Sequence, residues 1–577
     1  MAESAGFNPV AALRNFARNS PWIFMAVALH LIIIAGAAVF YTASHEQKRE
    51  EEPTTVAVTR KTETAEELPI PPEQIDRKAI PKNEEREIVS FEEDVYIPTN
   101  ESVPEDLSQD RGDPDSVDNL SGGSTGGTAI GVGTVGHAGL RPSAFGGRRL
   151  GPGAKKGRPG GPTEGTEKAV LDGLRWLCRH QAEDGSWSYG RLKTICTSDK
   201  PCYDPKAQIT DNYNDGLTAL SLLAFLGAGY GHDAKQTIVD TTRAKRHVVG
   251  DVVKKGLAYL LKKQNPDGSF SSGDRPFMYN ESLAAMALTE AYGLSQNRYY
   301  KEPAQKAINF MIASQRPNPS GQGKWGWRYD GLKYVEREVG IGTGAAENKA
   351  ILFDSDISAT GWCVMALKSA KLSGLNVPEE AMQGGMAFAK YVTADNGMVG
   401  YVDPKQAGQA VSGGGDHYTY HPAVMSALGM CIRIFVEHDP NDTFLPLAAA
   451  QVVKDLPDAG KADAKTGERL SVDYYYWYYA SIALNQFDGP DAPKKTGKYW
   501  GPWNKKMVDA IMVLQDQTDD RKTEADPTRR ACQNGGWIVP DRWGSHYGGP
   551  VYQTAINVLT LEVYYRFENA FGGAKRN

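Results

Sequence analysis

From about residue 165 onward, apolar residues recur at the spacing of α-helices. The segments 169–190 and 252–273 repeat one pattern, in which an apolar helical stripe is followed by Gln, an Asp-Gly pair and an aromatic residue. This spacing places the stripe on one face of each helix. The Asp-Gly pairs at 184–185 and 267–268 are expected to end these helices, because glycine accepts the left-handed backbone conformation.

Six helix pairs follow from this pattern. Weaker copies of the first helix lie at 304–315, 384–401 and 506–517, with a degenerate copy near 448–456. Between them run helices that are small and apolar almost all round, at 214–229, 280–293, 357–370, 421–434, 474–487 and 552–565. A helix with one apolar stripe must bury that stripe against another element, and a helix that is apolar on all sides must be surrounded by other elements. The sequence therefore predicts an all-α fold, a single (α/α)6 toroid over 165–577, with a linear solenoid of helix pairs as the competing architecture.

The repeated pattern resembles the QW repeat of squalene-hopene cyclases, shared more loosely by protein prenyltransferase β subunits. The resemblance covers roughly 167–567 and implies a toroid of the terpenoid cyclase superfamily. In that family, the Gln and the aromatic residue of each repeat tie the ends of the outer helices together. For this chain the resemblance implies the pairs Gln181 with Trp187, Gln264 with Phe270, and Gln315 with Trp325.

The acid motif of the cyclases has a partial counterpart here. Those enzymes carry Asp-x-Asp-Asp-Thr-Ala, and its middle acid protonates an alkene, whereas this chain reads FDSDISATGWCVMAL. Matching the carboxylates places Asp354 and Asp356 on the first two acids, while matching Thr360 places Ser358 on the proton donor. A serine hydroxyl is too weak an acid for that step. Asp354 and Asp356 are the candidate catalytic residues, although the position of Asp356 favours a cap or first-turn acid of the following helix.

Metal and cysteine chemistry give weaker signals. The zinc site of prenyltransferases uses Asp, Cys and His, and the last repeat offers Cys532, Asp541 and His546. No Asp-x-Cys pair begins an inner helix, so the sequence predicts neither a metal ion nor another cofactor. Cys196 and Cys202 close a small disulfide if the domain is exported, or otherwise stay reduced.

The starts of the inner helices are rich in aromatic and polar residues, which a ring would direct toward one mouth. Such a mouth suits a lipid, a sugar or a peptide. The alternative is that the rings fill the funnel and hydrogen-bond at its rim. The residues predicted to contact a ligand are Tyr279, Glu281, Trp362, His417, Tyr418, Tyr420, His421, Tyr475, Trp477 and Tyr552.

The N-terminal part predicts a membrane tether. After a short tail at 1–19, residues 20–42 contain a 20-residue uncharged apolar run, long enough for a transmembrane helix. A cleaved signal peptide is the alternative. Residues 43–164 are rich in Pro and Glu and then in Gly, which predicts a disordered linker with a reach on the order of 60 Å.

The net charge of −6 and the scattered basic residues argue against nucleic acid as a partner. The sequence therefore predicts a single-pass protein of the bacterial inner membrane with its toroid outside the cytoplasm. The predicted function is a binding module for a lipid, glycan or envelope protein, without cyclase activity. An isoprenoid cyclase that uses Asp354 or Asp356, and a polysaccharide-active enzyme, are the alternatives.

Overall fold

The computed structural model describes residues 159–196, 201–204, 211–240, 243–270, 277–341, 351–409, 411–412, 419–437, 439–461, 469, 471–517, 532–541 and 544–566. All of them belong to one compact unit, Pro98–Asn577. The predicted transmembrane helix at 20–42, the tail before it and most of the predicted linker lie outside these residues. Across the described segments, no helix combines the length and the apolar character needed to cross a bilayer.

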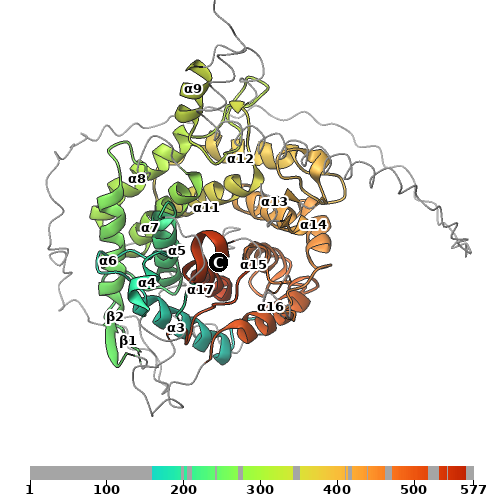
Figure 1. Ribbon diagram of the computed structural model, residues 1–577. Helices are drawn as coiled ribbons and strands as arrows, with labels where there is room; N and C mark the ends of the chain where they lie inside the picture. Colours follow the sequence, from blue (N-terminus) through green and yellow to red (C-terminus); the bar gives the residue numbers. More distant parts are fainter. Residues whose placement is uncertain are drawn as a thin grey trace, which may run out of the picture. The chain divides into compact units, whose positions relative to one another are not determined.

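An inner ring of six helices forms the centre of the fold. These helices are α5 (Asn214–Gly227), α7 (Met278–Ser295), α11 (Ile357–Ser373), α13 (Pro422–Val436), α15 (Tyr474–Asp488) and α17 (Ser545–Leu561). Each inner helix contacts the next one along the chain, and α17 contacts α5, so the ring is closed (Figure 1). A linear solenoid would leave its first and last repeats apart.

An outer ring of six helices surrounds the inner one. It consists of α3 (Glu164–Arg179), α6 (Val249–Lys263), α8 (Arg298–Ala313), α12 (Glu379–Tyr391), α14 (Phe444–Val452) and α16 (Trp500–Leu514). Helix α3 packs against α17 and also contacts α16, which joins the first repeat to the last. The folded part begins before α3, because Thr163 caps this helix and the Gly160 carbonyl accepts from Trp500 Nε1 at 2.9 Å.

The connections add elements that an all-α prediction leaves out. Two short antiparallel hairpins pair β1 (Thr237–Asp240) with β2 (Lys245–Val248), and β3 (Val411–Ser412) with β4 (Thr419–Tyr420). Short helices also occur at α4 (Leu192–Ile195), α9 (Leu332–Ile341) and α18 (Val563–Arg566), with a 3₁₀ turn at Pro404–Gln406. In β1, alternate residues are buried, which fixes this hairpin against the end of α3.

The repeat glutamines tie neighbouring repeats together. Gln181 Nε2 donates to the carbonyl of Gly185 in its own turn at 3.0 Å, and to that of Val252 in α6 at 2.9 Å. Gln264 and Gln315 make the same pair of bonds one and two repeats later. Gln515 donates to Gly535 and to Ala169 in α3, each at 2.9 Å, so the same bond closes the ring.

In the third repeat, Gln315 Nε2 does donate to the Trp325 carbonyl at 2.7 Å, but another tryptophan takes the role that Trp187 has in the first repeat. Trp187 Nε1 donates to Leu177 at 2.8 Å, and its backbone N–H donates to Thr218 on the inner helix. Trp327, and not Trp325, makes both equivalent bonds. The two tryptophans lie only two positions apart in a loop of different length, so spacing along the chain does not separate them.

The Asp-Gly pairs form turns beyond the helix ends, which corrects the prediction that they terminate the helices. Helix α3 already ends at Arg179, and α6 ends at Lys263. Gly185 has φ +88°, and a Cβ there would lie 2.2 Å from the Lys255 carbonyl oxygen of α6. The glycine is therefore needed both for the left-handed backbone and for close approach to the next outer helix.

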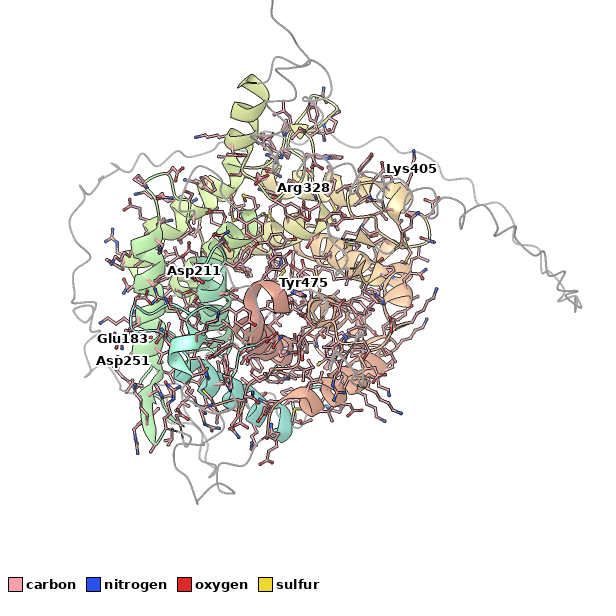
Figure 2. The ribbon with its side chains drawn as sticks, in the orientation of Figure 1. Glu183, Asp211, Asp251, Arg328, Lys405 and Tyr475 are labelled. Atoms are coloured by element: carbon pink, nitrogen blue, oxygen red, sulfur yellow. The ribbon has the colours of Figure 1, made fainter. Side chains whose placement is uncertain are left out.

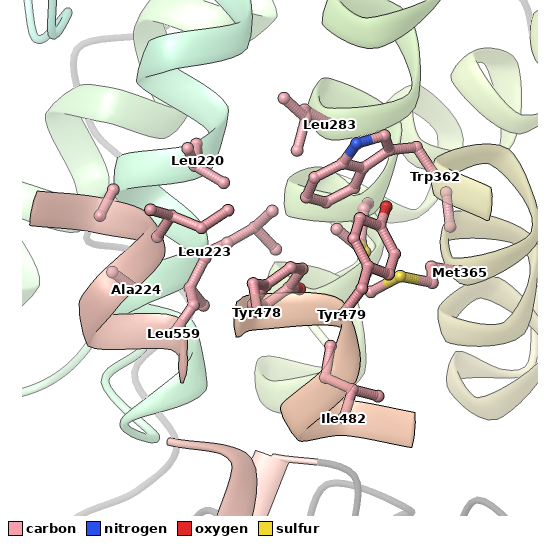
Figure 3. Close-up of a cluster of buried hydrophobic side chains, with 14 of the residues drawn as sticks. Leu220, Leu223, Ala224, Leu283, Trp362, Met365, Tyr478, Tyr479, Ile482 and Leu559 are labelled. Atoms are coloured by element: carbon pink, nitrogen blue, oxygen red, sulfur yellow. The ribbon is translucent and has the colours of Figure 1, made fainter. Parts of the chain in front are cut away.

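Side chains from several inner helices fill the middle of the ring. Trp362 of α11 packs against Tyr478 and Tyr479 of α15, with its ring centroid 5.6 and 5.4 Å from theirs. Leu220 and Leu223 of α5 and Leu559 of α17 close the same cluster (Figure 3). These side chains are almost completely buried, so any ligand surface lies toward an end of the ring.

Candidate functional site

A chain of hydroxyl groups links the starts of three inner helices. Tyr279, the second residue of α7, donates to Ser358 Oγ of α11 at 2.8 Å, and Ser358 is hydrogen-bonded to the Tyr475 hydroxyl of α15. All three are second residues of their helices, so the N-termini of these helices lie at the same end of the ring. This is the end of the inner helices at which the sequence predicts a mouth. Tyr475 lies well inside the outer ring, whereas Glu183 and Asp251 lie at its edge (Figure 2).

Several residues predicted to contact a ligand lie in the core instead. Trp362, Tyr475, Trp477 and Tyr552 have exposed fractions of 3%, 1%, 2% and 6%. Glu281 is also buried, and its carboxylate accepts from the backbone N–H of Phe270 at 2.9 Å. Their placement matches the alternative in which aromatic side chains fill the funnel.

His421, which was predicted to contact a ligand, is held by contacts within the fold. His421 is the N-cap of α13, its Nδ1 accepts from the Ala423 N–H at 3.1 Å, and its Nε2 pairs with Asp455. Its ring stacks on Tyr476 at 4.4 Å. His417 and Tyr418 lie outside the described residues. The backbone of Tyr420 pairs with Val411 in the short hairpin.

Asp356 is held by both of its carboxylate oxygens. It is the N-cap of α11, where Oδ1 accepts from the Ala359 N–H at 2.7 Å, and Oδ2 accepts from Arg328 Nη1 at 3.2 Å. Burial raises the pKa of Asp356 to about 6, and the Arg328 guanidinium opposes this rise. Asp354 pairs with Arg328 Nε at 3.0 Å, and its side chain is 42% exposed. The capping role predicted for Asp356 is confirmed.

Partly exposed aromatic rings extend outward from this ion-pair cluster. We call Tyr213, Phe277, Tyr329 and Tyr547 the aromatic strip. Phe277 lies 5.5 Å from Tyr213 and 6.4 Å from Tyr329 between ring centroids, and Tyr213 lies 5.1 Å from Tyr547. The Arg328 guanidinium lies 4.5 Å above the Tyr329 ring. The strip joins the starts of α5, α7 and α17 into one apolar surface beside a charged cluster.

A pocket of about 650 Å³ is lined by Asp354 of the same ion pair. We call it the Asp354 pocket. Its walls come from the loops before α11, from α12 and from the loop that follows α12. Its aromatic residues and carboxylates are Trp325, Phe353, Phe388, Tyr391, Asp354 and Asp403. Tyr391 is 50% exposed. Aromatic walls with a few polar groups are typical of sites that bind small organic ligands.

The residues weighed as zinc ligands of the last repeat are not brought together as one set. Cys532 instead lies in a buried cluster with His180, Cys196 and Cys202 of the first repeat. All six cysteines are free thiols in the structure, including Cys196 and Cys202. Sequence reasoning missed His180, because it follows directly on α3 and lies more than 350 residues from Cys532 along the chain.

Comparisons with known proteins add a weak structural likeness. No known protein family matches the chain, and no curated protein matches it. The solved alpha-1,6-mannanase GH76A of Salegentibacter sp. HEL1_6 is 11% identical with a TM-score of 0.40, over 70% of this chain and 100% of that chain. The type II terpene cyclase MstE from Scytonema is 10% identical with a TM-score of 0.39, over 69% and 97%. Cellobiose 2-epimerase from Bacillus thermoamylovorans B4167 is 11% identical with a TM-score of 0.40, over 67% and 95%.

At this level of similarity, none of these proteins informs the activity of this chain. The contacts between its own helices define the class of protein, since two concentric, closed rings of helices are an α/α toroid.

Proposed function

We propose that this protein is a membrane-anchored binding module whose toroid holds a carbohydrate at the mouth of the ring. The observation that carries the proposal is that Arg328 links the aromatic strip to the Asp354 pocket, because its guanidinium lies over the Tyr329 ring and pairs with Asp354. A sugar ring offers an apolar face, which stacks on aromatic side chains, and hydroxyl groups, which bond to carboxylates and guanidinium groups. The strip and the pocket together offer both kinds of group.

The geometry around Asp356 favours binding over proton transfer. A general acid must reach the group that it protonates. Asp356 is fully buried, and both of its oxygens already accept hydrogen bonds. In the middle of the ring, Trp362 packs against two tyrosines at the place where a folded polyene chain would need space.

Glycan-array binding of the purified full-length protein, followed by calorimetry on the glycans that bind, tests this proposal. Tyr547→Ala and Tyr391→Ala each remove one partly exposed ring, and each is expected to weaken binding by about 10-fold. Leu447→Ala is the control, because this side chain is 46% exposed on α14 and lies in neither the strip nor the pocket. If no glycan binds, or if both tyrosine variants bind like the wild type, the proposal fails.

An isoprenoid cyclase is the second candidate, favoured by the raised pKa of the buried Asp356 carboxyl group. Incubation with squalene and shorter isoprenoids tests it. Cyclised products that disappear in Asp356→Asn would replace the binding proposal with the cyclase.

A polysaccharide-active enzyme is the third candidate, because two carboxylates, Asp354 and Asp403, line one pocket. Shortened or isomerised products from a bound glycan, lost in Asp354→Asn and Asp403→Asn, would support it.

The proposed anchor is the transmembrane helix predicted at 20–42, with the toroid outside the cytoplasm of a bacterial inner membrane. The predicted linker gives the toroid reach toward ligands in the cell envelope. Protease added to cells stripped of their outer layer should then release toroid fragments. Protection of the toroid until the inner membrane is broken would contradict this orientation.

A further inference from the structure

Three cysteines and one histidine from distant parts of the chain meet at the C-terminal end of α3. The Nε2 atom of His180 and the sulfur atoms of Cys196, Cys202 and Cys532 all lie within 4.8 Å of one another, and all four residues are buried. His180 Nε2 is 3.0 Å from the Cys532 sulfur and 3.4 Å from the Cys202 sulfur. Ligand atoms at about 2.0–2.3 Å from a tetrahedral zinc ion lie about 3.6–3.8 Å from each other. The cluster therefore needs only small shifts to enclose one ion.

The histidine ring is held in the orientation that a metal ligand needs. Its Nδ1 lies 2.8 Å from the Trp176 carbonyl oxygen. A carbonyl only accepts, so the proton is on Nδ1 and the lone pair of Nε2 faces the three sulfur atoms. The ring also stacks on the Trp176 side chain at 3.9 Å. Metal-bound histidines have the same outer partner, a backbone carbonyl at the second nitrogen.

Cationic side chains surround the cysteines. Arg243 Nη2 lies 3.7 Å from the Cys532 sulfur and donates to the Ile195 carbonyl at 2.8 Å. Three thiolates and one neutral imidazole on Zn²⁺ carry a net charge of −1, which the Arg243 guanidinium balances. Arg179 is neutralised separately by Asp240, and it donates to the Cys532 carbonyl at 3.0 Å. The cluster therefore has a compensating charge in place, as a buried anionic site requires.

The cluster lies where the two ends of the toroid meet. His180, Cys196 and Cys202 belong to the first repeat, and Cys532 belongs to the last. Gln533, next to Cys532, donates to the Pro201 carbonyl at 2.8 Å across the same boundary. A bond network that joins residues more than 330 positions apart holds these loops together. A metal ion here would fix the closure of the ring.

We propose that this protein binds one zinc ion through His180, Cys196, Cys202 and Cys532, and that the ion fastens the first repeat to the last. Four protein ligands fill a tetrahedral coordination shell, so the ion is structural and leaves no position for a substrate. Thiolate and imidazole ligands in this geometry select zinc over magnesium, calcium or manganese. The proposal is independent of the carbohydrate site, which lies among the starts of the inner helices.

Elemental analysis of the full-length protein, purified after growth with added zinc, tests the site directly. We expect about one zinc per chain, and a cobalt-loaded sample should show thiolate-to-metal charge transfer together with the visible bands of a tetrahedral ion. Cys532→Ala should lose the metal. Cys431→Ala is the matched control, because this cysteine is equally buried but lies in α13, away from the cluster.

Two further measurements keep the proposal testable if Cys532→Ala folds poorly. A strong zinc chelator should lower the unfolding temperature of the wild type and of Cys431→Ala by about 5 °C or more, because metal bound only to the folded state stabilises it. Non-reducing peptide mapping should find Cys196 and Cys202 as thiols once the metal is removed. A metal-free wild type that takes up neither zinc nor cobalt, or a Cys196 to Cys202 disulfide in the purified protein, would overturn the zinc site.

Discussion

The hydrogen bonds of Gln515 should carry much of the stability of the closed ring. Its side-chain amide is buried and donates to Ala169 and Gly535, which belong to the first and last repeats. Gln515→Ala removes both bonds and leaves a small cavity. Buried bonds of this kind contribute about 1 kcal/mol each, and the cavity adds to the loss, so we expect a decrease of about 2–3 kcal/mol in the free energy of unfolding.

The matched control is Gln305→Ala. Gln305 also bridges two neighbouring outer elements, since its amide donates to Asn309 and to the Asn376 carbonyl, but these bonds are exposed to water. Water replaces them in the variant, so the expected loss is under about 1 kcal/mol. Urea denaturation followed by circular dichroism measures both variants in the full-length protein.

Hydrogen exchange shows which part of the ring loses stability in the variant. In Gln515→Ala, amides of α3 and of 535–537 should exchange faster than those of α11, because the boundary between first and last repeats opens before the rest of the ring. Equal stability of the two variants, or faster exchange spread evenly round the ring, would refute the role given to this residue.

Two more predictions concern the backbone and charge. Gly185→Ala should lower the free energy of unfolding by more than about 3 kcal/mol, because the new Cβ lies 2.2 Å from the Lys255 carbonyl oxygen. Gly374→Ala is the control, with a similar φ of +81° and no atom within 4 Å of the new Cβ, and it should lower the free energy of unfolding by about 1–2 kcal/mol. Equal thermal denaturation midpoints for the pair would contradict this contact. Folding raises the pKa of Asp356 from 3.8 to about 6, so between these pH values the unfolded chain binds fewer protons than the folded one. The contribution of Asp356 to stability is therefore present at low pH and is lost as the pH rises through about 6. Asp356→Asn should therefore flatten the fall in stability between about pH 4 and pH 6, by on the order of 2–3 kcal/mol, and an unchanged pH profile would count against a buried, protonatable Asp356.

Local patterns were enough to predict the helices. The stripes of α3 and α6, and the all-apolar character of α7 and α11, follow from spacings of three and four residues, which depend only on the geometry of one helix. The capping role of Asp356 is equally local, because an N-cap side chain reaches the backbone three residues ahead.

The proposed ligand surface overlaps the predicted one only in part. Both lie at the starts of the inner helices, but the sequence did not indicate which rings stay exposed, so Trp362 and Tyr475 were chosen although they fill the core. Phe277, Tyr329 and Tyr547 were missed. Exposure depends on what neighbouring helices cover, and neighbours in a ring come from repeats far apart in the chain.

By itself, the sequence determined the main helices and their pairing into six repeats, because both depend on residues close together along the chain. Only the tertiary structure decided that α17 meets α5, that Gln515 bonds to Ala169, and that Cys532 joins His180. Contacts across hundreds of residues leave no local pattern, since they arise only when the curvature of every repeat adds up to a closed ring.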